Sequence, residues 1–377
     1  MNRIRKNCND ATIGSTESTV YDDGLNHKGI FRSAKSSENG RQSIANQSKQ
    51  AHGLTSNKTL LVASFFAGVG GIDLGLAQTG RFQTVYANEF DRYAAMTFGA
   101  NFGLKVDCRD IRSVQPKDIP DVDIFAFGFP CQCFSIAGKQ HGFADEKGRG
   151  LLFFEVLRLA NAKKPRILLA ENVKNLATHN HGNTLRVIQE AMEDEGYKVK
   201  YLVMDASKYG NVPQHRERII LVGFTVDEDY ERFSFPEPIP LTIGIRDVID
   251  FVNPVQDKYY YYPNRYTNGI YEKLNAEMND PTAIYQWRRT FVRKNMSSLV
   301  QTLTANMGQG GHNVPLIRAD DGRIRKLTPH ECFNVQGFPS DFVLPNISDS
   351  QLYKQAGNSV CVGLFKRLGN ALSKAML

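Results

Sequence analysis

Short apolar runs alternate with amphipathic helical stretches from residue 58 to residue 235, and this alternation constrains the fold more than any other feature. The runs cover residues 60–66, 84–87, 124–127, 167–170, 200–204 and 219–224. Apolar residues at helical spacing lie between them, over residues 72–78, 92–98, 151–160 and 184–195. Strands that are apolar throughout and alternate with helices are typical of βαβ units around a buried parallel sheet. We therefore expect an α/β fold with a parallel sheet here.

The rest of the chain differs in composition from this α/β part. Residues 236–345 are rich in Pro, Gly, Tyr and Arg, so we expect a second, smaller domain over residues 236–352. Helical spacing returns in residues 353–377, which we expect to pack back onto the first domain. Residues 1–57 are rich in Ser, Asn, Gly, Gln and Lys and predict a disordered extension. A basic arm that contacts phosphates and a small regulatory module remain alternatives for this extension.

Composition excludes several classes of protein. No stretch approaches the roughly 20 consecutive apolar residues that cross a bilayer, and the N-terminus lacks the apolar segment of a secretory signal. The six cysteines are scattered apart from Cys131 and Cys133, so we expect no disulfide framework and a reducing cytoplasm. The formal net charge of +7 is compatible with nucleic acid as a partner.

The residues that follow the first apolar runs suggest a cofactor site, because ligands of open α/β sheets bind outside the carboxyl ends of the strands. The sequence FAGVGG at residues 66–71 forms a glycine turn whose backbone N–H groups can approach an anionic group closely. Asp73 stands where a nicotinamide-binding motif has glycine. Glu89 follows the second run and can accept from ribose hydroxyls, and Asp110 with Ile111 suits an adenine. This pattern indicates an adenosine-containing cofactor, with a structural tight turn as the alternative.

A candidate nucleophile follows the third apolar run. Pro130 stiffens the turn there, and Cys131 comes next, where a thiolate can reach into the crevice. Cys131 and Cys133 lack a second pair of ligands at zinc-site spacing. Redox pairs use C-x-x-C, whereas this pair is C-x-C. Buried, unreactive cysteines remain an alternative at this point.

Polar residues also follow the later runs. Glu171 comes after four apolar residues, where partial desolvation suits a carboxyl group to donate a proton, and a helix-capping or salt-bridged glutamate is the alternative. Arg216 and Arg218 are two residues apart, so in an extended chain both point to one face and can form forked hydrogen bonds. We expect His215, beside them, to face solvent. The sequence GNSV at residues 357–360 opens the last helical stretch and offers polar caps to a ligand.

In their order along the chain, these segments resemble the motif set of the DNA (cytosine-5)-methyltransferases, in particular the bacterial restriction–modification enzymes of the HhaI type. The segments are residues 66–71, 130–132, 171–173, 214–218 and 357–360. Further matches lie in residues 138–150, 302–303 and 326–339, so that the resemblance covers residues 59 to 377.

The resemblance implies a fold and a chemistry. The fold is a Rossmann-like S-adenosylmethionine-dependent methyltransferase domain with a smaller, irregular β-rich target-recognition domain, and DNA lies between them. Cys131 would attack carbon 6 of a flipped-out cytosine, Glu171 would contact ring nitrogen 3 and the exocyclic amine, and Arg218 would hold the base oxygen and orient Glu171, with Arg216 beside it. No metal is implied. The residues expected to bind S-adenosylmethionine are Phe66, Gly68, Gly70, Glu89, Phe90, Asp110, Ile111, Pro130, Asn358 and Ser359.

Other segments are expected to contact double-stranded DNA. The glycine-rich residues 135–149 resemble the mobile catalytic loop of the family, with Ser135 and Arg149 near phosphates, and a solvated surface loop is the alternative. Residues 254–293 interleave basic and aromatic side chains, which suits phosphate contacts and groove recognition. We expect Arg288, Arg289 and, further on, Thr302 to bind DNA. Because aromatic clusters often belong to a core, we expect half of the tyrosines in this segment to be buried.

The resemblance implies a monomer in the bacterial cytoplasm that protects host DNA from a cognate restriction endonuclease, to which it is linked genetically. Two alternatives remain open from sequence. One is a transfer-RNA cytosine methyltransferase, because a branch of the family shares these motifs. The other is a catalytically silent DNA-binding regulator, against which the presence of Cys131, Glu171 and Arg218 argues. Cys133 has no assigned role.

Overall fold

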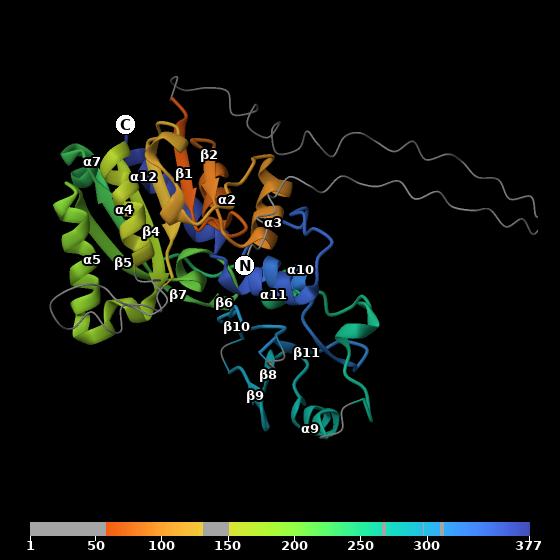
Figure 1. Ribbon diagram of the computed structural model, residues 1–377. Helices are drawn as coiled ribbons and strands as arrows, with labels where there is room; N and C mark the ends of the chain where they lie inside the picture. The colour runs from red at the N-terminus through yellow and green to blue at the C-terminus, as the bar shows by residue number, and fades with distance from the viewer. Residues whose placement is uncertain (1–57, 131–150, 266–268, 297, 310–312) are drawn as a thin grey trace, which may run out of the picture. The chain divides into compact units, whose positions relative to one another are not determined.

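A six-stranded sheet forms the centre of the part of the chain that the computed structural model describes (Figure 1). The described residues are 58–130, 151–265, 269–296, 298–309 and 313–377. The N-terminal extension predicted for residues 1–57 and the loop predicted for residues 135–149 lie outside them. Along the sheet the strands are β2 (Phe82–Asn88), β1 (Leu60–Phe65), β3 (Ile124–Gly128), β4 (Ile167–Val173), β7 (Glu217–Phe224) and β5 (Lys198–Asp205). Each of the six predicted apolar runs falls on one of these strands.

The sheet is mixed, so the expectation of a parallel sheet is wrong for one strand. Strands β2, β1, β3 and β4 pair in parallel, whereas β7 is antiparallel to both of its neighbours, β4 and β5. The reason lies in the connection. Parallel strands need a crossover of about a dozen or more residues, usually a helix. Between β5 and β7 the chain has only the short helix α6 (Ala206–Tyr209) and the strand β6 (Gln214–His215), and it returns antiparallel.

Helices cover both faces of this sheet because successive strand residues point to opposite sides. On one face, residues such as Val62 and Ile124 pack against α2 (Gly71–Ala77) and α12 (Val362–Ala375). On the other, neighbours such as Ala63 and Phe125 pack against α4 (Leu151–Lys163) and α5 (Asn183–Asp194). The C-terminal helix α12 thus packs beside α2, near the start of the described chain. Two apolar layers therefore fix the sheet between helices.

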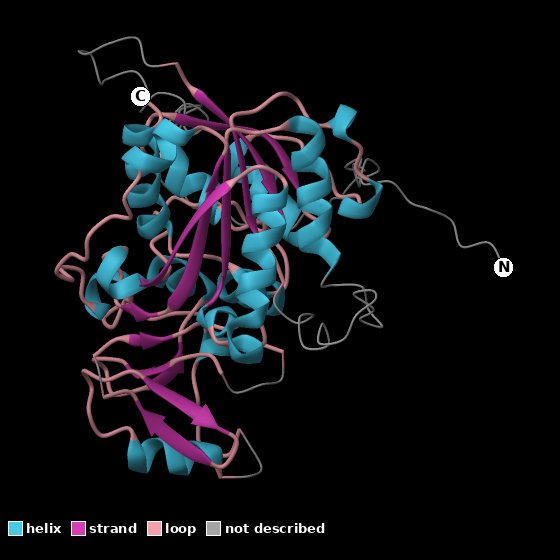
Figure 2. Ribbon diagram, turned by 90° about the vertical axis from the view of Figure 1, so that its left-hand side faces the viewer, coloured by secondary structure: helices cyan, strands magenta, loops and turns pink. Residues whose placement is uncertain are grey.

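A second, antiparallel sheet lies between residues 285 and 326 (Figure 2). Its strands are β12 (Ile324–Lys326), β11 (Leu316–Arg318), β8 (Tyr285–Arg288) and β9 (Phe291–Lys294), and α9 (Ile270–Glu277) packs against them. A two-stranded pair of β6 with β10 (Val300–Gln301) connects this region to the strand β7. The helices α3 (Arg92–Phe102), α10 (Pro329–Val335) and α11 (Asp349–Asn358) and the short α7 (Asp227–Arg232) and α8 (Ile245–Val248) complete the arrangement. No helix among the described residues is both long and apolar enough to span a membrane.

The tyrosine cluster divides as expected. Tyr259 and Tyr260 are buried, whereas Tyr261 and Tyr262 are partly exposed. Tyr259 belongs to the apolar cluster around Phe333. Half of these aromatic rings therefore serve the core.

Asp73 is a buried carboxyl group between α2 and the first two strands. It accepts hydrogen bonds from Ser64 Oγ on β1 at 3.0 Å and from Thr84 Oγ1 on β2 at 2.7 Å. Burial raises the pKa of Asp73 to about 6, although the two hydroxyl donors favour the ionised form. Asp73, which replaces the glycine of a nicotinamide-binding motif, thus links α2 to β1 and β2.

We predict that Asp73→Asn changes how stability depends on pH. In wild type, the folded Asp73 retains a proton between about pH 4 and pH 6 that the unfolded chain has released. This group therefore makes the free energy of unfolding fall as pH rises through that window, by about 3 kcal/mol at most. The neutral amide removes this contribution. Urea denaturation at pH 4.5, 5.5 and 7 should show a smaller fall in the variant; equal falls in both proteins would contradict the assignment.

Candidate active site

Glu171 and the turns that carry several of the predicted cofactor residues lie at one edge of the central sheet, because the parallel strands β2, β1, β3 and β4 end there. From β1 the chain passes to β2 on one side and then crosses to β3 on the other, so the strand order reverses between β1 and β3. The turn that begins at Phe66 follows β1, Glu89 follows β2 and Pro130 follows β3. This edge is where ligands of open α/β sheets bind.

Glu171 and Arg218 form an ion pair at this edge. Arg218 Nε lies 2.8 Å from Glu171 Oε1, and both side chains are largely buried. Glu171 lies opposite Ile220 in the antiparallel pair of β4 with β7, so Arg218, two residues before Ile220, is its diagonal neighbour on the same face. Gly128 on β3 lies opposite Glu171, and a Cβ there would come within 3.2 Å of Glu171 Oε2. Strand register and a small neighbour therefore position the carboxylate.

Asn172 anchors the turn that leads to the candidate nucleophile. Its Nδ2 donates to the carbonyl oxygen of Phe129 at 2.9 Å in a buried hydrogen bond. Pro130 is the next residue, and Cys131 and Cys133 lie outside the described part of the chain. The sequence pattern assigns no separate role to Asn172, although its place directly after Glu171 is a signal. The segment before Cys131 is thus tied to the strand that carries Glu171.

Arg216 does not join the ion pair of Glu171 with Arg218. Its buried guanidinium donates to the main-chain carbonyls of Leu303 at 2.9 Å, Gly357 at 3.2 Å and Ser359 at 2.5 Å. The expected fork of Arg216 and Arg218 is not observed, because Arg216 lies in the break between β6 and β7 rather than inside one extended strand. Burial and the charge of Arg218 lower the pKa of Arg216 to about 9, so the group stays charged at neutral pH.

Two buried glutamines extend this junction. Gln214 Nε2 donates to Gln336 Oε1 at 3.1 Å, and Gln336 Nε2 donates to the carbonyl of Ala356 at 2.9 Å. The N–H of Leu303 donates to Gln214 Oε1 at 3.2 Å. The local sequence around Gln336 indicates no role for it, because its partner Gln214 lies more than 100 residues away in the chain. Side-chain amides therefore join β6, the segment after β10, and the helices α10 and α11.

The glycine turn after β1 adopts the left-handed backbone that glycine permits. Gly68 has φ 57° and Gly70 has φ 86°, and Phe66 has φ 50° as well. The Gly68 N–H donates to Glu89 Oε2 at 2.8 Å, and the Gly70 N–H donates to the carbonyl of Ala67. These two N–H groups are thus used within the protein, contrary to the expectation that they face an anionic ligand. Burial raises the pKa of Glu89 above its usual value.

The other predicted cofactor residues surround this turn. The Phe90 ring is 73% exposed, and the Ser359 Oγ is buried without a hydrogen-bond partner among the described residues. A Cβ at Gly71 would come within 2.7 Å of that hydroxyl. Asn358, the last residue of α11, is exposed. An exposed aromatic face, a buried carboxylate and an unsatisfied hydroxyl are groups that fit a ligand with an adenine, a ribose and an amino-acid end.

Asp110 and Ile111 lie close to the end of β2 through a hydrogen bond that Asn88 Nδ2 makes to the carbonyl of Arg109. Asp110 pairs with Arg112 at 2.5 Å, which lowers the pKa of Asp110. Ile111 is 3% exposed and belongs to the core beside α4. Asp110 therefore offers a polar surface at this edge, whereas most of the Ile111 side chain is already covered.

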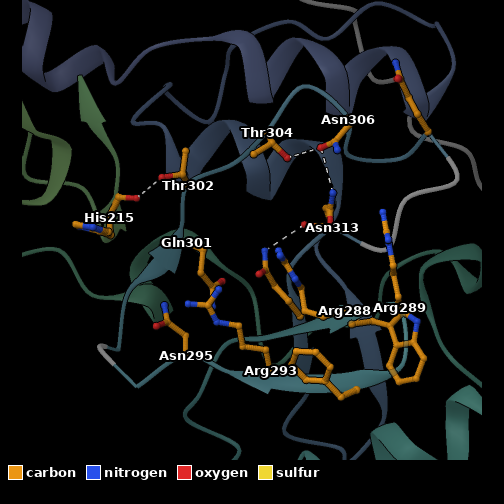
Figure 3. Close-up of a pocket in the computed structure, with 14 residues that line it drawn as sticks. His215, Arg288, Arg289, Arg293, Asn295, Gln301, Thr302, Thr304, Asn306 and Asn313 are labelled. Carbon is orange, nitrogen blue, oxygen red and sulfur yellow. Dashed lines mark hydrogen bonds between the residues drawn. The ribbon is translucent and has the colours of Figure 1, made fainter. Parts of the chain in front are cut away.

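The residues predicted to contact DNA line a separate pocket of about 1070 Å³ (Figure 3). Arg288 and Arg289 come from the turn of the β8–β9 hairpin, and Thr302 follows β10. Thr302 Oγ1 donates to the carbonyl of His215 at 2.6 Å. The His215 side chain is exposed, in agreement with the prediction, and pairs with Asp205. Ser135 and Arg149 lie outside the described residues.

Solved structures share this fold. The DNMT2 mutant of Spodoptera frugiperda matches with a TM-score of 0.64 at 18% identity, over 83% of this chain and 99% of that chain. The Dnmt2 methyltransferase of S. pombe matches with a TM-score of 0.61 over 82% of this chain and 97% of that chain, also at 18% identity. The central sheet with its helices is thus a Rossmann-like methyltransferase fold.

Sequence comparisons identify the family. The family model of the C-5 cytosine-specific DNA methylases matches residues 60–374. The type II methyltransferase M.Bsp6I of Bacillus sp. (strain RFL6) is 52% identical over 318 residues, which are 84% of this chain and 100% of that protein. M.HhaI of Haemophilus parahaemolyticus is 36% identical over 330 residues, with 82% of this chain and 93% of that protein covered. The chain belongs to this family and is a DNA (cytosine-5)-methyltransferase, which confirms the resemblance seen in its sequence.

We predict that Arg216→Met destabilises the protein, because it leaves three buried carbonyls without their donor. The free energy of unfolding, measured by urea denaturation, should fall by about 3 kcal/mol. Arg246→Met is the matched control: Arg246 pairs with Asp320 at 2.8 Å in an exposed ion pair, and its loss should cost at most about 1 kcal/mol. If Arg216→Met has the same free energy of unfolding as wild type, the hydrogen bonds of Arg216 do not stabilise the fold as proposed.

Proposed function

We propose that this enzyme methylates carbon 5 of a cytosine that is flipped out of a specific double-stranded DNA sequence, through a covalent adduct with Cys131. The ion pair of Glu171 with Arg218 is the observation that carries the proposal. It lies at the same edge of the sheet as Pro130, the residue before Cys131, and Asn172 links the two segments. A carboxylate from β4 and a guanidinium from β7 thus lie beside the segment that leads to Cys131.

The roles that we assign to Cys131, Glu171 and Arg218 follow from the low reactivity of cytosine at carbon 5. Carbon 5 of cytosine is a weak nucleophile and is buried in the duplex, so the base must leave the stack at a cost of a few kcal/mol. The Cys131 thiolate forms a bond to carbon 6, and the electrons of the 5,6 double bond make carbon 5 nucleophilic. Glu171 binds ring nitrogen 3 and the exocyclic amine, where charge develops, and Arg218 orients Glu171 and holds the base oxygen.

The second half of the reaction restores the aromatic ring. Once carbon 5 carries both a methyl group and a hydrogen, a base removes that hydrogen as a proton. The remaining electron pair re-forms the 5,6 double bond, and the bond between carbon 6 and Cys131 breaks to return the thiolate. No described residue stands out as the base.

The cofactor that fits the predicted residues is S-adenosylmethionine, which when bound would supply an electrophilic methyl group to carbon 5 and leave as the thioether S-adenosylhomocysteine, its sulfur keeping the electrons of the broken bond. Glu89 retains acceptor capacity for ribose hydroxyls beyond its bonds to Gly68 and Asp91. Phe90 offers its exposed ring to the adenine, with Asp110 and Ile111 beside it. The remaining contacts that we assign to the cofactor are those of Phe66, Gly68, Gly70, Pro130, Asn358 and Ser359.

The biological role that we infer is the protection of host DNA in a restriction–modification system. Its support is that M.Bsp6I, 52% identical to this chain, is a type II methyltransferase. The cognate endonuclease would be linked genetically, and the enzyme would act as a monomer in the bacterial cytoplasm. In this proposal residues 58–235 and 353–377 form the catalytic domain, residues 236–352 form the target-recognition domain, and DNA lies between them.

Transfer of a labelled methyl group tests the substrate. The protein is incubated with labelled S-adenosylmethionine and either cytosine-containing duplex DNA or transfer RNA, and incorporation into each is counted. Bisulfite sequencing of DNA from a host that expresses the gene then gives the target sequence. Incorporation into transfer RNA alone would overturn the proposed substrate.

We predict that Cys131→Ser lowers kcat by about 1,000-fold or more, while binding of duplex DNA persists. Cys133→Ala, the matched control two residues away, should retain substantial activity. The adduct itself can be trapped with 5-fluorocytosine in the target. A base removes the hydrogen of carbon 5 as a proton but cannot remove a fluorine there, so the bond to the enzyme is not broken. Mass spectrometry should then find DNA attached to wild type and to Cys133→Ala. An adduct with Cys131→Ser, or equal losses in both variants, would contradict the assignment.

A further inference from the structure

The β8–β9 hairpin presents one polar face and one buried face. Gln286 pairs with Arg293 across the hairpin, and Arg288 pairs with Phe291. Side chains alternate along a strand, so the intervening Trp287 is buried against α9 and the second sheet. Arg288, Phe291 and Arg293 are exposed on the opposite face, which lines the pocket of about 1070 Å³. The hairpin is therefore a two-stranded ribbon with a cationic outer face.

The charges of this pocket are unbalanced. Three arginines, Arg288, Arg289 and Arg293, line it, and the described lining contains no carboxylate. None of their three guanidinium groups forms a hydrogen bond or ion pair with a described residue, whereas the guanidinium groups of most other arginines in the described chain do. Eight of the other lining side chains are amides or hydroxyls. Such a surface is complementary to an anionic ligand that also carries many hydrogen-bonding groups.

Gln301 gives a second, independent sign of a ligand. Its side-chain nitrogen and oxygen are both buried, and neither has a hydrogen-bond partner within the described structure. Leaving a buried amide unpaired is unfavourable, so such groups in native proteins are normally satisfied. In Figure 3 the side chain of Arg293 extends from β9 toward Gln301 and Asn295. An unsatisfied amide and an unpaired guanidinium thus lie on the same side of the pocket.

Duplex DNA offers hydrogen-bond acceptors and negative charge to the arginines of this surface, and donors and acceptors to Gln301. The major groove admits a two-stranded ribbon, and arginine binds the O6 and N7 acceptors of guanine with its two forked donors. Glutamine can both donate and accept at a base edge. Arg288 and Arg289 lie at the turn of the hairpin, and Arg289 has the left-handed φ of 59° that is uncommon for a residue with a side chain. Arg293 lies inside β9, away from this turn.

We propose that Arg293 and Gln301 determine the target sequence by binding base edges, that Arg293 binds a guanine, and that Arg288 and Arg289 contact phosphates. This inference rests on the proposed function and adds the identity of one base that the enzyme reads. The sequence that this enzyme methylates therefore contains a guanine at a fixed distance from the methylated cytosine.

The experiment begins with the target sequence of the wild-type enzyme, taken both from bisulfite sequencing and from selection of the duplexes that the protein binds in a randomised pool. Each guanine of a target duplex is then replaced singly by 7-deazaguanine, which keeps Watson–Crick pairing but lacks the N7 acceptor. Methylation rates and binding, by fluorescence anisotropy, are measured for wild type, Arg293→Gln, Arg293→Lys, Gln301→Ala and, as the matched control, Arg289→Gln. Thermal unfolding of each variant shows that it is folded.

Wild type should lose about 10- to 100-fold in methylation rate at one 7-deazaguanine position. Arg293→Gln should show a similar loss of methylation rate on the unmodified target. Placing 7-deazaguanine at the sensitive position should lower its rate no further. Arg293→Lys, which keeps the charge but not the forked donors, should behave in the same way. Gln301→Ala should relax the sequence preference at one position. Arg289→Gln should weaken binding to all sequences alike and lower the slope of log K against log salt by about 0.9.

Three results would overturn the inference. The first is that Arg293→Gln weakens binding to all sequences equally with a reduced salt slope, which is the behaviour of a phosphate contact. The second is that Arg293→Gln remains as sensitive to 7-deazaguanine as wild type at every position. The third is that Gln301→Ala keeps the full sequence preference. The anisotropy measurement separates this test from the proposed function, because guanine discrimination in binding is read even if wild type transfers no methyl group.

Discussion

The buried guanidinium of Arg216 is the interaction on which the arrangement of the described chain depends most. A charge removed from water is unfavourable unless hydrogen bonds replace its hydration, and Arg216 donates to the carbonyls of Leu303, Gly357 and Ser359. Leu303 lies in the segment after β10, and the other two lie at the end of α11. One side chain thus ties the start of β7 to the segment of the polar pocket and to the C-terminal helices.

Arg218 follows two residues later, inside β7, so one continuous segment of the chain carries both the junction and the active-site cation. Because β7 runs antiparallel to β4, its first residues lie at the edge where the parallel strands end, and Arg218 reaches Glu171 there. A parallel β7 would bring its last residues to that edge instead. The short connection from β5, which leaves no room for a crossover, therefore has a direct consequence for the chemistry.

Local patterns predicted the features that depend on neighbouring residues in the chain. The apolar runs form strands because a sheet that is covered by helices on both faces buries the side chains on both sides of each strand. The glycine turn after β1 has the positive φ values that glycine tolerates. Features that depend on distant residues were missed. The acceptors of Arg216, the partner of Gln214 and the unsatisfied amide of Gln301 leave no local trace, because each depends on which segments are packed together.

The amino-acid sequence by itself determined the α/β class, the order of the motifs and the family, since each of these is written in residue types and in their spacing. Tertiary structure decided which of two neighbouring arginines meets Glu171 and which is enclosed by carbonyls. It also decided that the β8–β9 hairpin has a cationic face, with no carboxylate among the described residues that line its pocket. The physical reason is that burial and hydrogen-bond partners belong to a position in space. Two arginines with the same chemistry in sequence differ only in the groups that the fold brings to them.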